Sequence, residues 1–453
     1  MNMKRMTLAA MCTCLLQLTG CKKFFDVRPN TSEVNPVAIS DFKEMLNSDS
    51  TALCNYVLSD FMSDDIRIED AHQAVDARSA YIRSYLWSET IWQAGSQDHT
   101  YNSTYSNILQ MNIIIDRIDR AKGPDSEKEL VRAQAQINRA SYYLQLANIY
   151  GLDYRASNAA TDLAVPLVTI ADPGQLPSRA TVKQVYDFIL QDLNAAVNTS
   201  SLPGMGQDII HPGKAAGYAL LARAYLYMGK YDEALSAANA ALKINSRLLK
   251  YTKDYTPPSV LLDLAQHPEI LLGRMCIDYD FFNIRHVPFS ISPSLFSLFS
   301  SDDVRFTNNF ANGMYVPGDI NSSIAFDYSV RVPEVMLIKA ECLARQQRAA
   351  DALALVNEIR KNRLLNYQPL DPSTDAMTAV LSERRRELFC HGGLRLFDLK
   401  RLNRDPQFAQ TLQRKADNGT DVIATLPVNS PRYLMPFSPF VINNNPAIIQ
   451  NPR

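Results

Sequence analysis

The side chains that could do chemistry in this chain are aromatic rings and polar groups that occur together in irregular stretches. A flat ring can cover the apolar C–H face of a sugar, while amides, carboxylates and guanidinium groups hydrogen-bond its hydroxyls. One such stretch contains Trp87, Tyr101 and Asn102, and it follows a turn with Asp64 and Asp65. Either aspartate could accept hydrogen bonds from hydroxyls or stabilise the N-terminus of a helix. Both Trp87 and Tyr101 could equally be core residues.

A second aromatic and polar group lies in a long segment without helical periodicity, and it comprises Tyr279, Phe281, Phe282, Asn283 and Arg285. Tyr315, between Gly313 and Gly318, could also stand exposed. Long irregular segments in compact proteins are usually functional. Although each of these residues could instead pack in a core, we expect the ligand-binding site on these two stretches.

Two neighbouring aromatic residues are better explained by packing. Trp92 and Tyr105 precede a predicted helical run from Ile108 to Ile118. Their spacing relative to that run is typical of core positions. We therefore expect both side chains to be buried.

The motifs that could indicate an enzyme are incomplete. His391-Gly392-Gly393 resembles the oxyanion loop of esterases, but the sequence has no G-x-S-x-G motif to supply a nucleophile. Ser40-Asp41-Phe42-Lys43 fits S-x-x-K without a following S-D-N or K-T-G, so Ser40 is better explained as a helix cap. The six histidines form no H-E-x-x-H motif. We expect a protein that is not an enzyme and has no metal site or cofactor.

The run Glu383-Arg384-Arg385-Arg386-Glu387 could suggest a catalytic or phosphate-binding patch. On a helix, however, Glu383 and Glu387 lie one turn apart with arginines next to both. We therefore interpret the run as a set of structural ion pairs.

Cysteine usage indicates little chemistry. Cys54, Cys276, Cys342 and Cys390 are widely separated, and none belongs to a C-x-x-C pair. A zinc or redox centre is therefore not expected. A disulfide among them stays open, and burial as small apolar side chains is the simpler expectation.

The N-terminus has the pattern of a bacterial export signal. Lys4 and Arg5 precede an apolar run from Met6 to Leu18, which is too short to span a bilayer. Leu18-Thr19-Gly20-Cys21 resembles the lipobox of bacterial lipoproteins. This resemblance implies that residues 1–20 are removed and that Cys21 carries the lipid anchor. The alternative is an ordinary signal peptide with an accidental cysteine.

The charge balance excludes one class of partner. The sequence contains 46 Lys and Arg against 47 Asp and Glu, for a net charge of −1. A basic surface for nucleic acid is therefore not expected.

Helical periodicity predicts a mainly α fold built from helix pairs. The clearest pair, between residues 215 and 246, has the spacing of a tetratricopeptide (TPR) repeat, with Tyr218, Leu221, Ala222, Tyr225, Gly229, Tyr231, Ala234, Ala238 and Ala241 at its characteristic positions. A second pair is predicted at 332–361. A third joins Leu130–Tyr150, with Gly151 as its C-cap, to Thr181–Val197, with Thr181 as its N-cap.

Stacked pairs of this kind predict an α-solenoid scaffold. Residues 152–180 and 246–330 lack helical rhythm and are rich in Pro, Asp, Ser, Asn and aromatic residues. We expect them to form long irregular loops on the ligand-facing side. The tail from 425 to 453 should be extended and irregular but packed against the body.

Several ordered motifs resemble the SusD-like (RagB/SusD) lipoproteins of the Bacteroidetes outer membrane. The first is the start at 21–29, Cys-Lys-Lys-Phe-Phe-Asp-Val-Arg-Pro, and the second is Ala164-Val165-Pro166-Leu167-Val168 followed by the stretch from Arg179 to Tyr186. The third is Glu383–Leu388 with Arg395-Leu396-Phe397-Asp398-Leu399 after it. The fourth is the ending from Leu434-Met435-Pro436-Phe437 to Gln450-Asn451-Pro452.

The resemblance implies a binding role at the cell surface. Such proteins capture oligosaccharides, or peptides in some members, and deliver them to a SusC-like, TonB-dependent outer-membrane transporter. A protein-interaction scaffold without a ligand is a further alternative.

The resemblance also suggests how the chain is divided. A signal peptide at 1–20 would precede a SusD-like N-terminal region at 21–250. A loop-rich ligand-side region would follow at 251–330, and a SusD/RagB-type C-terminal region at 331–453.

Overall fold

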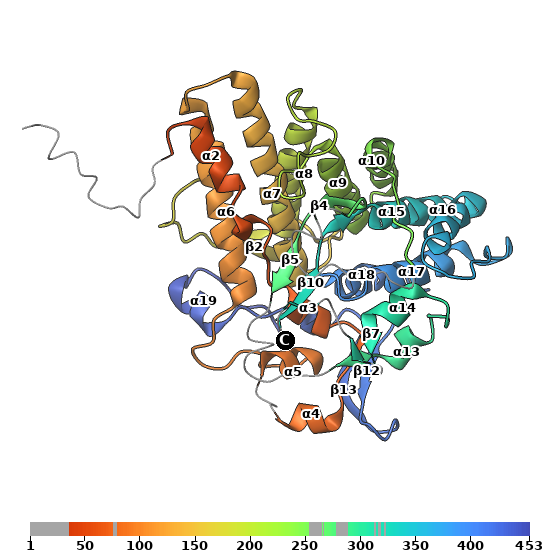
Figure 1. Ribbon diagram of the computed structural model, residues 1–453. Coiled ribbons are helices and arrows are strands. Elements are labelled where there is room, and N and C mark those ends of the chain that lie inside the picture. Colours follow the sequence, from red (N-terminus) through yellow and green to blue (C-terminus); the bar gives the residue numbers. More distant parts are fainter. Residues whose placement is uncertain are drawn as a thin grey trace, which may run out of the picture. The chain divides into compact units, whose positions relative to one another are not determined.

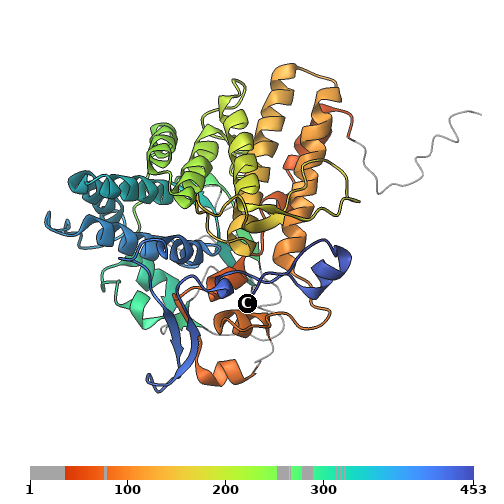
Figure 2. The same cartoon turned by 180° about the vertical axis from the view of Figure 1, so that it is seen from behind.

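In the computed structural model, Ala38–Arg453 forms one compact unit. Its frame is a row of antiparallel helix pairs (Figure 1). The structure describes residues 36–75, 79–252, 265, 267–277, 289–311, 314–315, 319–320 and 323–453. The row comprises α6 (His99–Arg117), α7 (Asp125–Tyr150), α8 (Val182–Asn198), α9 (Lys214–Met228), α10 (Tyr231–Ile244), α15 (Val332–Arg345) and α16 (Ala349–Lys361). Each helix packs against the next, and they lie side by side in both views (Figure 1, Figure 2). The predicted mainly α fold with TPR-like pairs is confirmed.

Small residues allow α9 and α10 to lie close together. Gly229 ends α9 with a φ of 73°, a left-handed conformation that residues with a side chain adopt rarely. On α10, Ala234, Ala238 and Ala241 are fully buried. Because alanine adds so little volume, the two helix axes can approach each other. The helix pair predicted between residues 215 and 246 is therefore confirmed, with its turn at Gly229-Lys230.

The α7–α8 pair forms as predicted, with two differences in detail. Thr181 caps α8, since its Oγ1 accepts a hydrogen bond of 3.2 Å from the backbone N–H of Gln184. Helix α7 begins at Asp125 rather than Leu130. Gly151 is the C-cap of α7 as predicted, and it has an extended conformation, φ −104° and ψ 157°. Glycine is favoured at this position because a Cβ atom would lie only 2.6 Å from the carbonyl oxygen of Ala147.

Helix α6 begins earlier than the sequence pattern suggested. Asp98 caps it by accepting a hydrogen bond of 3.1 Å from the N–H of Tyr101. The run expected from Ile108 to Ile118 is thus the second half of a helix that starts at His99. Polar residues in the first two turns hid this start from the periodicity.

Short antiparallel strands occupy part of the segment 246–330 that was expected to be irregular. A four-stranded sheet has the order β1 (Ile66–Arg67), β6 (Ser290–Ile291), β8 (Met314–Tyr315), β7 (Phe310–Ala311). A three-stranded sheet has the order β5 (Met275–Ile277), β10 (Ser323–Asp327), β9 (Asp319–Ile320). The remaining pairs are β11 (Val330–Arg331) with β4 (Ile270–Leu272), β12 (Leu412–Lys415) with β13 (Val422–Leu426), and β2 (Leu163–Pro166) with β3 (Arg179–Thr181).

The other helices connect and cover these strands and the helix row. They are α2 (Ile39–Leu46), α3 (Val57–Phe61), α4 (Asp70–Val75), α5 (Ala80–Tyr85), α13 (Pro293–Phe296), α14 (Val304–Asn309), α17 (Ala376–Glu387), α18 (Leu394–Leu402) and α19 (Pro439–Asn444), with short 3₁₀ helices η2 (Asp49–Thr51), η3 (Ile118–Arg120) and η4 (Pro431–Tyr433). The tail packs on α7, since Met435 N–H donates to the Ile149 carbonyl at 3.0 Å. The expected packing of the tail is confirmed, whereas η4 and α19 interrupt its expected extended course.

The Glu383–Glu387 run lies on α17 and forms buried ion pairs. Arg305 Nη1 contacts Glu383 at 2.7 Å and Glu387 at 2.8 Å. Arg363, which is fully buried, donates to both Glu387 and Glu269 at 2.8 Å. The structural interpretation of this run is therefore confirmed, with most partners coming from other segments rather than from α17 itself.

The four cysteines of the described chain are free and buried. This agrees with their expected role as small apolar side chains. Among the described residues, no helix is both long and apolar enough to cross a membrane.

Candidate functional site

Asp64 and Asp65 lie in the turn between α3 and β1, where two arginines hold them. Arg395 donates from Nε to Asp64 Oδ1 at 2.7 Å and from Nη2 to Asp64 Oδ2 at 2.9 Å. Arg385 donates from Nε to Asp65 Oδ1 at 2.5 Å. The Asp64 side chain is 16% exposed and that of Asp65 is 2% exposed. The turn is thus fixed to α17 and α18, and neither aspartate caps a helix.

The two carboxyl groups have opposite electrostatic environments. Burial raises the pKa of Asp64, but the Arg395 guanidinium outweighs this effect and holds the pKa well below its usual value. Burial raises the pKa of Asp65, and Arg385 offsets the rise only in part. Each oxygen of Asp64 accepts one hydrogen bond from Arg395, so this carboxylate fixes the turn to α18, and its role in binding stays a prediction.

Trp87 is a core residue in this structure, which decides between the two alternatives left open by the sequence and corrects its candidacy as a ligand-binding residue. Its side chain has 0% exposure, and its indole Nε1 donates to the Met62 carbonyl at 2.8 Å. The Arg414 guanidinium lies 4.3 Å from the centre of the ring. A ring covered in this way has no face left for a ligand, because the α3–β1 turn and β12 enclose it.

Tyr101 and Asn102 lie on the first turn of α6 and are both half-buried. The Tyr101 ring packs edge-on against Tyr150 and Phe437, with centroids 5.9 and 5.8 Å apart. It therefore belongs partly to the core, while one side of this turn stays accessible. Its role in binding stays a prediction.

Trp92 and Tyr105 are packed as expected. Trp92 is 8% exposed, and its Nε1 donates to the Pro436 carbonyl at 2.6 Å. The Tyr105 hydroxyl donates to the Pro166 carbonyl at 2.5 Å.

The second predicted group cannot be placed. Tyr279, Phe281, Phe282 and Arg285 lie outside the described residues, and so does Asn283. The backbone of Tyr315 belongs to β8, but its side chain lies outside the described part. Of the first group, Asp64 and Asp65 follow Met62, whose carbonyl accepts a hydrogen bond from Trp87. Tyr101 instead packs against Phe437 of the tail.

The His391-Gly392-Gly393 stretch does not present an oxyanion hole. The N–H of Gly393 donates to Asp60 Oδ1 at 2.7 Å, and that of Gly392 donates to Asp60 Oδ2 at 3.2 Å. Tyr328 donates its hydroxyl to the same carboxylate at 2.9 Å. A buried side chain of the protein therefore occupies the place of an oxyanion.

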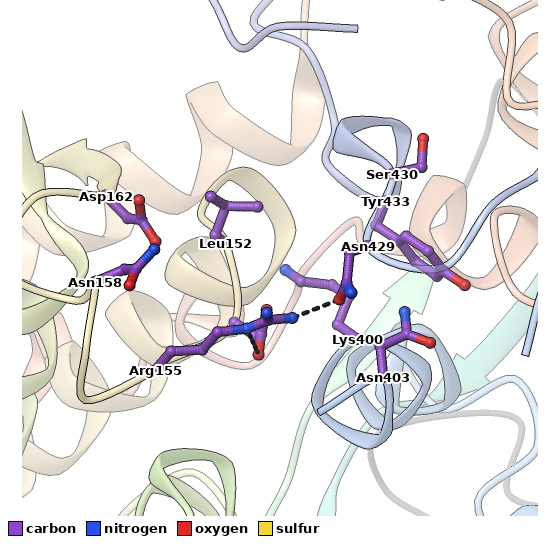
Figure 3. A pocket seen from close by; sticks show the side chains of 10 residues that line it. Leu152, Arg155, Asn158, Asp162, Lys400, Asn403, Asn429, Ser430 and Tyr433 are labelled. Carbon is purple, nitrogen blue, oxygen red and sulfur yellow. Dashed lines mark hydrogen bonds and ion pairs between the residues drawn. The ribbon is translucent and has the colours of Figure 1, made fainter. Parts of the chain in front are cut away.

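A polar pocket of about 150 Å³ lies where three segments meet (Figure 3). One wall is the loop after α7, a second is the end of α18, and the third is the tail around η4. The lining residues are Leu152, Asp153, Arg155, Asn158, Asp162, Lys400, Asn403, Asn429, Ser430 and Tyr433. Sequence reasoning identified the loop 152–180 as functional in character but did not select these residues, because their three segments are far apart in the chain.

Lys400 is buried beneath this pocket. Its ammonium donates to the carbonyls of Asn148 and Gly151, each at 2.6 Å. Burial lowers the pKa of Lys400 to about 7, although nearby Asp153 favours the charged form. The lysine thus fixes the C-terminal end of α7, where unpaired helix carbonyls need donors.

Within the described residues, no group of three or more His, Cys, Asp or Glu side chains is placed to hold a metal ion.

Two family models match this chain at its two ends. Residues 23–226 match a family described as starch-binding and associating with the outer membrane, and residues 305–453 match the SusD family. The chain belongs to the SusD/RagB family. Among curated proteins, none matches the sequence.

Solved structures of the SusD/RagB type share the fold over almost the whole chain. A SusD superfamily protein from Bacteroides thetaiotaomicron has a TM-score of 0.74 at 21% identity, covering 92% of this chain and 100% of that one. A SusD-like carbohydrate binding protein from Bacteroides vulgatus has a TM-score of 0.67 at 18% identity, covering 91% and 98%. Surface glycan-binding protein A from Bacteroides uniformis has a TM-score of 0.70 at 17% identity, covering 91% and 99%.

Proposed function

We propose that this SusD/RagB protein binds oligosaccharides at the outer membrane and passes them to a SusC-like, TonB-dependent transporter. The observation that carries the proposal is the family match at both ends of the chain, one part of it to a family described as starch-binding. The fold shared with a surface glycan-binding protein supports it. The protein would act by binding and release, without catalysis.

The proposed anchor is a lipid on Cys21, the residue that follows the lipobox-like Leu18-Thr19-Gly20. Several acyl chains on one residue hold a protein to a membrane far more firmly than one chain does. The body would then face the outside of the cell, where polymeric nutrients are encountered.

The proposed ligand-facing side is the region 251–330 together with the first turn of α6. The described part of this region forms short strands and the short helices α13 and α14 instead of long helix pairs. Loops on a rigid frame commonly carry binding residues. Tyr101 and Asn102 would contribute from α6. Tyr279, Phe281, Phe282, Arg285 and Tyr315 stay candidates from the loops.

Calorimetry of the purified protein against plant, host and microbial glycans, and separately against peptide mixtures, tests this function. Saturable binding of a glycan, with no heat from peptides, is the expected result. Heat from peptides alone would replace the glycan by a peptide ligand. Heat from neither, with retained binding to the transporter, would identify a scaffold.

A co-purification experiment tests the partner. A tagged copy expressed in its native host should retain one TonB-dependent barrel through a detergent wash. Recovery of the protein without any such barrel would contradict the proposed delivery step.

A further inference from the structure

The pocket of Figure 3 is lined by polar side chains that differ in exposure. Asn158 and Asn429 are exposed at the rim, while Arg155 and Asp162 are half-buried. At the floor, Asn403 and Tyr433 are 8% and 2% exposed. Buried polar groups are costly unless they are hydrogen-bonded, so a pocket with such a floor favours a polar occupant.

The floor retains hydrogen-bonding capacity. Within the described part of the chain, the buried hydroxyl of Tyr433 lacks a hydrogen bond of normal geometry, although the Asn403 side chain lies beside it. An asparagine amide offers both donors and an acceptor. Two adjacent hydroxyl groups of a ligand also offer a donor and an acceptor. One amide can therefore form two hydrogen bonds with them, donating one and accepting the other.

The charges around the pocket balance one another. Arg155 donates from Nε to Asp153 at 3.1 Å, and Arg404 lies 3.5 Å from the same carboxylate. On the same loop Asp162 is half-buried, and burial together with the charge of Asp153 raises its pKa. A free anion would meet Asp153 and Asp162, and a free cation would meet Arg155 and Lys400. The pocket therefore suits a neutral ligand.

Two of the walls are held at a set distance. Figure 3 shows Arg155 reaching across from the loop to Asn429, and its Nη2 donates to the Asn429 Oδ1. Asn429 has a φ of 59°, a left-handed conformation that asparagine tolerates better than most residues. Glycine would adopt this conformation with the least strain. Asn429 stands there instead, and its side-chain amide lies at the rim of the pocket.

The volume limits the size of the occupant. About 150 Å³ is much more than one water molecule needs, but it is less than the usual volume of a pocket for a drug-sized ligand. A single six-membered polyol ring, with hydroxyls around its edge, fits these limits.

We infer that this pocket, named here the Asn403 pocket, binds one neutral sugar residue through lining residues that lie outside the region 251–330. The inference rests on the proposed function in one respect, since it takes a glycan as the source of the sugar. The sugar could be a free monosaccharide or the end of a longer chain, and the two share the same hydroxyl chemistry.

Ligand-observed NMR with neutral monosaccharides, and with glucuronic acid and glucosamine as charged counterparts, tests the inference. Neutral sugars should bind the intact protein, and the charged ones should bind at least about tenfold more weakly, because one unmatched buried charge costs more than 1.4 kcal/mol. Equal binding of charged and neutral sugars would overturn the assigned chemistry.

Matched variants locate the site. Asn158→Ala and Asn403→Ala should each weaken monosaccharide binding by about tenfold, the loss expected for an unpaired polar contact. Asn194→Ala, an exposed amide on α8, should leave it unchanged. Because Asn158 is exposed, its variant keeps the test valid even if Asn403→Ala fails to fold. Unchanged binding in the Asn158 variant and in a folded Asn403 variant would overturn the inference.

Parallel titrations with long glycans distinguish this inference from the proposed function. Long glycans that bind while no monosaccharide does would overturn the Asn403 pocket alone. Monosaccharides that bind at the pocket while no long glycan does would support the pocket and overturn the proposed function. A long glycan whose affinity falls in the Asn158 variant would show that a chain end occupies the pocket.

Discussion

Arg384 donates from its Nε to Oδ2 of Asp398 at 2.7 Å, with both side chains buried. This pair joins α17 to α18, and Arg401 extends it by contacting both Asp398 and Glu341 of α15. Arg384 and Asp398, 14 positions apart and from two different sequence motifs, therefore belong to one buried ionic network. The network fixes α18, which carries Lys400 and ends at the C-cap Asn403, to α15 and α17.

Asp398→Ala should destabilise the protein strongly. It leaves Arg384 without its carboxylate in a buried site, a loss of about 3–5 kcal/mol in the free energy of unfolding. Arg384→Met should cost less, because Asp398 keeps Arg401. Urea unfolding measures both. The control is Asp351→Ala, which breaks a pair with Arg348 that is 54% exposed on each side and should change stability by only about 0.5 kcal/mol. Similar losses for Asp398→Ala and the control would contradict a stabilising network.

Trp87→Ala should lower the free energy of unfolding rather than weaken ligand binding selectively. Removing a fully buried indole costs about 3–5 kcal/mol. Phe296→Ala, at a ring that is 56% exposed, should have little effect on the urea midpoint. A Trp87→Ala protein with the wild-type urea midpoint and reduced glycan affinity would show that Trp87 contacts the ligand and is not a core residue.

Asp60 should make stability depend on pH. Burial raises the pKa of this carboxyl to about 7. A carboxyl group with a raised pKa binds more protons in the folded than in the unfolded state, so its contribution is complete below about pH 4 and declines as pH rises to about 7.

The comparison with Asp60→Asn isolates this effect, since other titrating groups are common to both proteins. The free energy of unfolding of the wild type minus that of the variant should decrease between pH 4.5 and pH 7.5, by about 1.4 kcal/mol per unit of pKa difference that is effective in this range. Urea titrations at the two pH values measure it. A difference that is constant, or that increases with pH, would show that the carboxyl keeps an ordinary or lowered pKa.

Cys21→Ala should release the protein from the membrane. Without a thiol at this position no acyl chain can be attached, and the protein would then be recovered in the aqueous fraction. Metabolic labelling with an alkyne fatty acid, followed by fractionation, measures both effects. Labelling that persists in the Cys21→Ala protein would place the lipid elsewhere, and an unlabelled wild type would favour an ordinary signal peptide.

The helix pairs were predictable because they depend on local information. The alanines of α10, the turn at Gly229 and the cap at Thr181 each act within a few residues, so periodicity and residue type suffice to locate them. The start of α6 was missed because its first turns are polar and its cap, Asp98, stands among other polar residues. The short strands of 270–331 were missed because strands of two to five residues carry little pattern of their own.

The sequence by itself determined the family and the helical frame, since motifs and helical spacing are read along the chain. It also indicated that the Glu383–Glu387 run is structural, but most of its partners, such as Arg305 and Arg363, come from other segments. Only the tertiary structure decided that Trp87 is a core residue, that Asp64 is held by Arg395, and that the Asn403 pocket exists. The physical reason is the same in all three cases. Burial and ion pairing are set by partners hundreds of residues away, such as Arg414 above Trp87, and no local pattern records which side chains will meet.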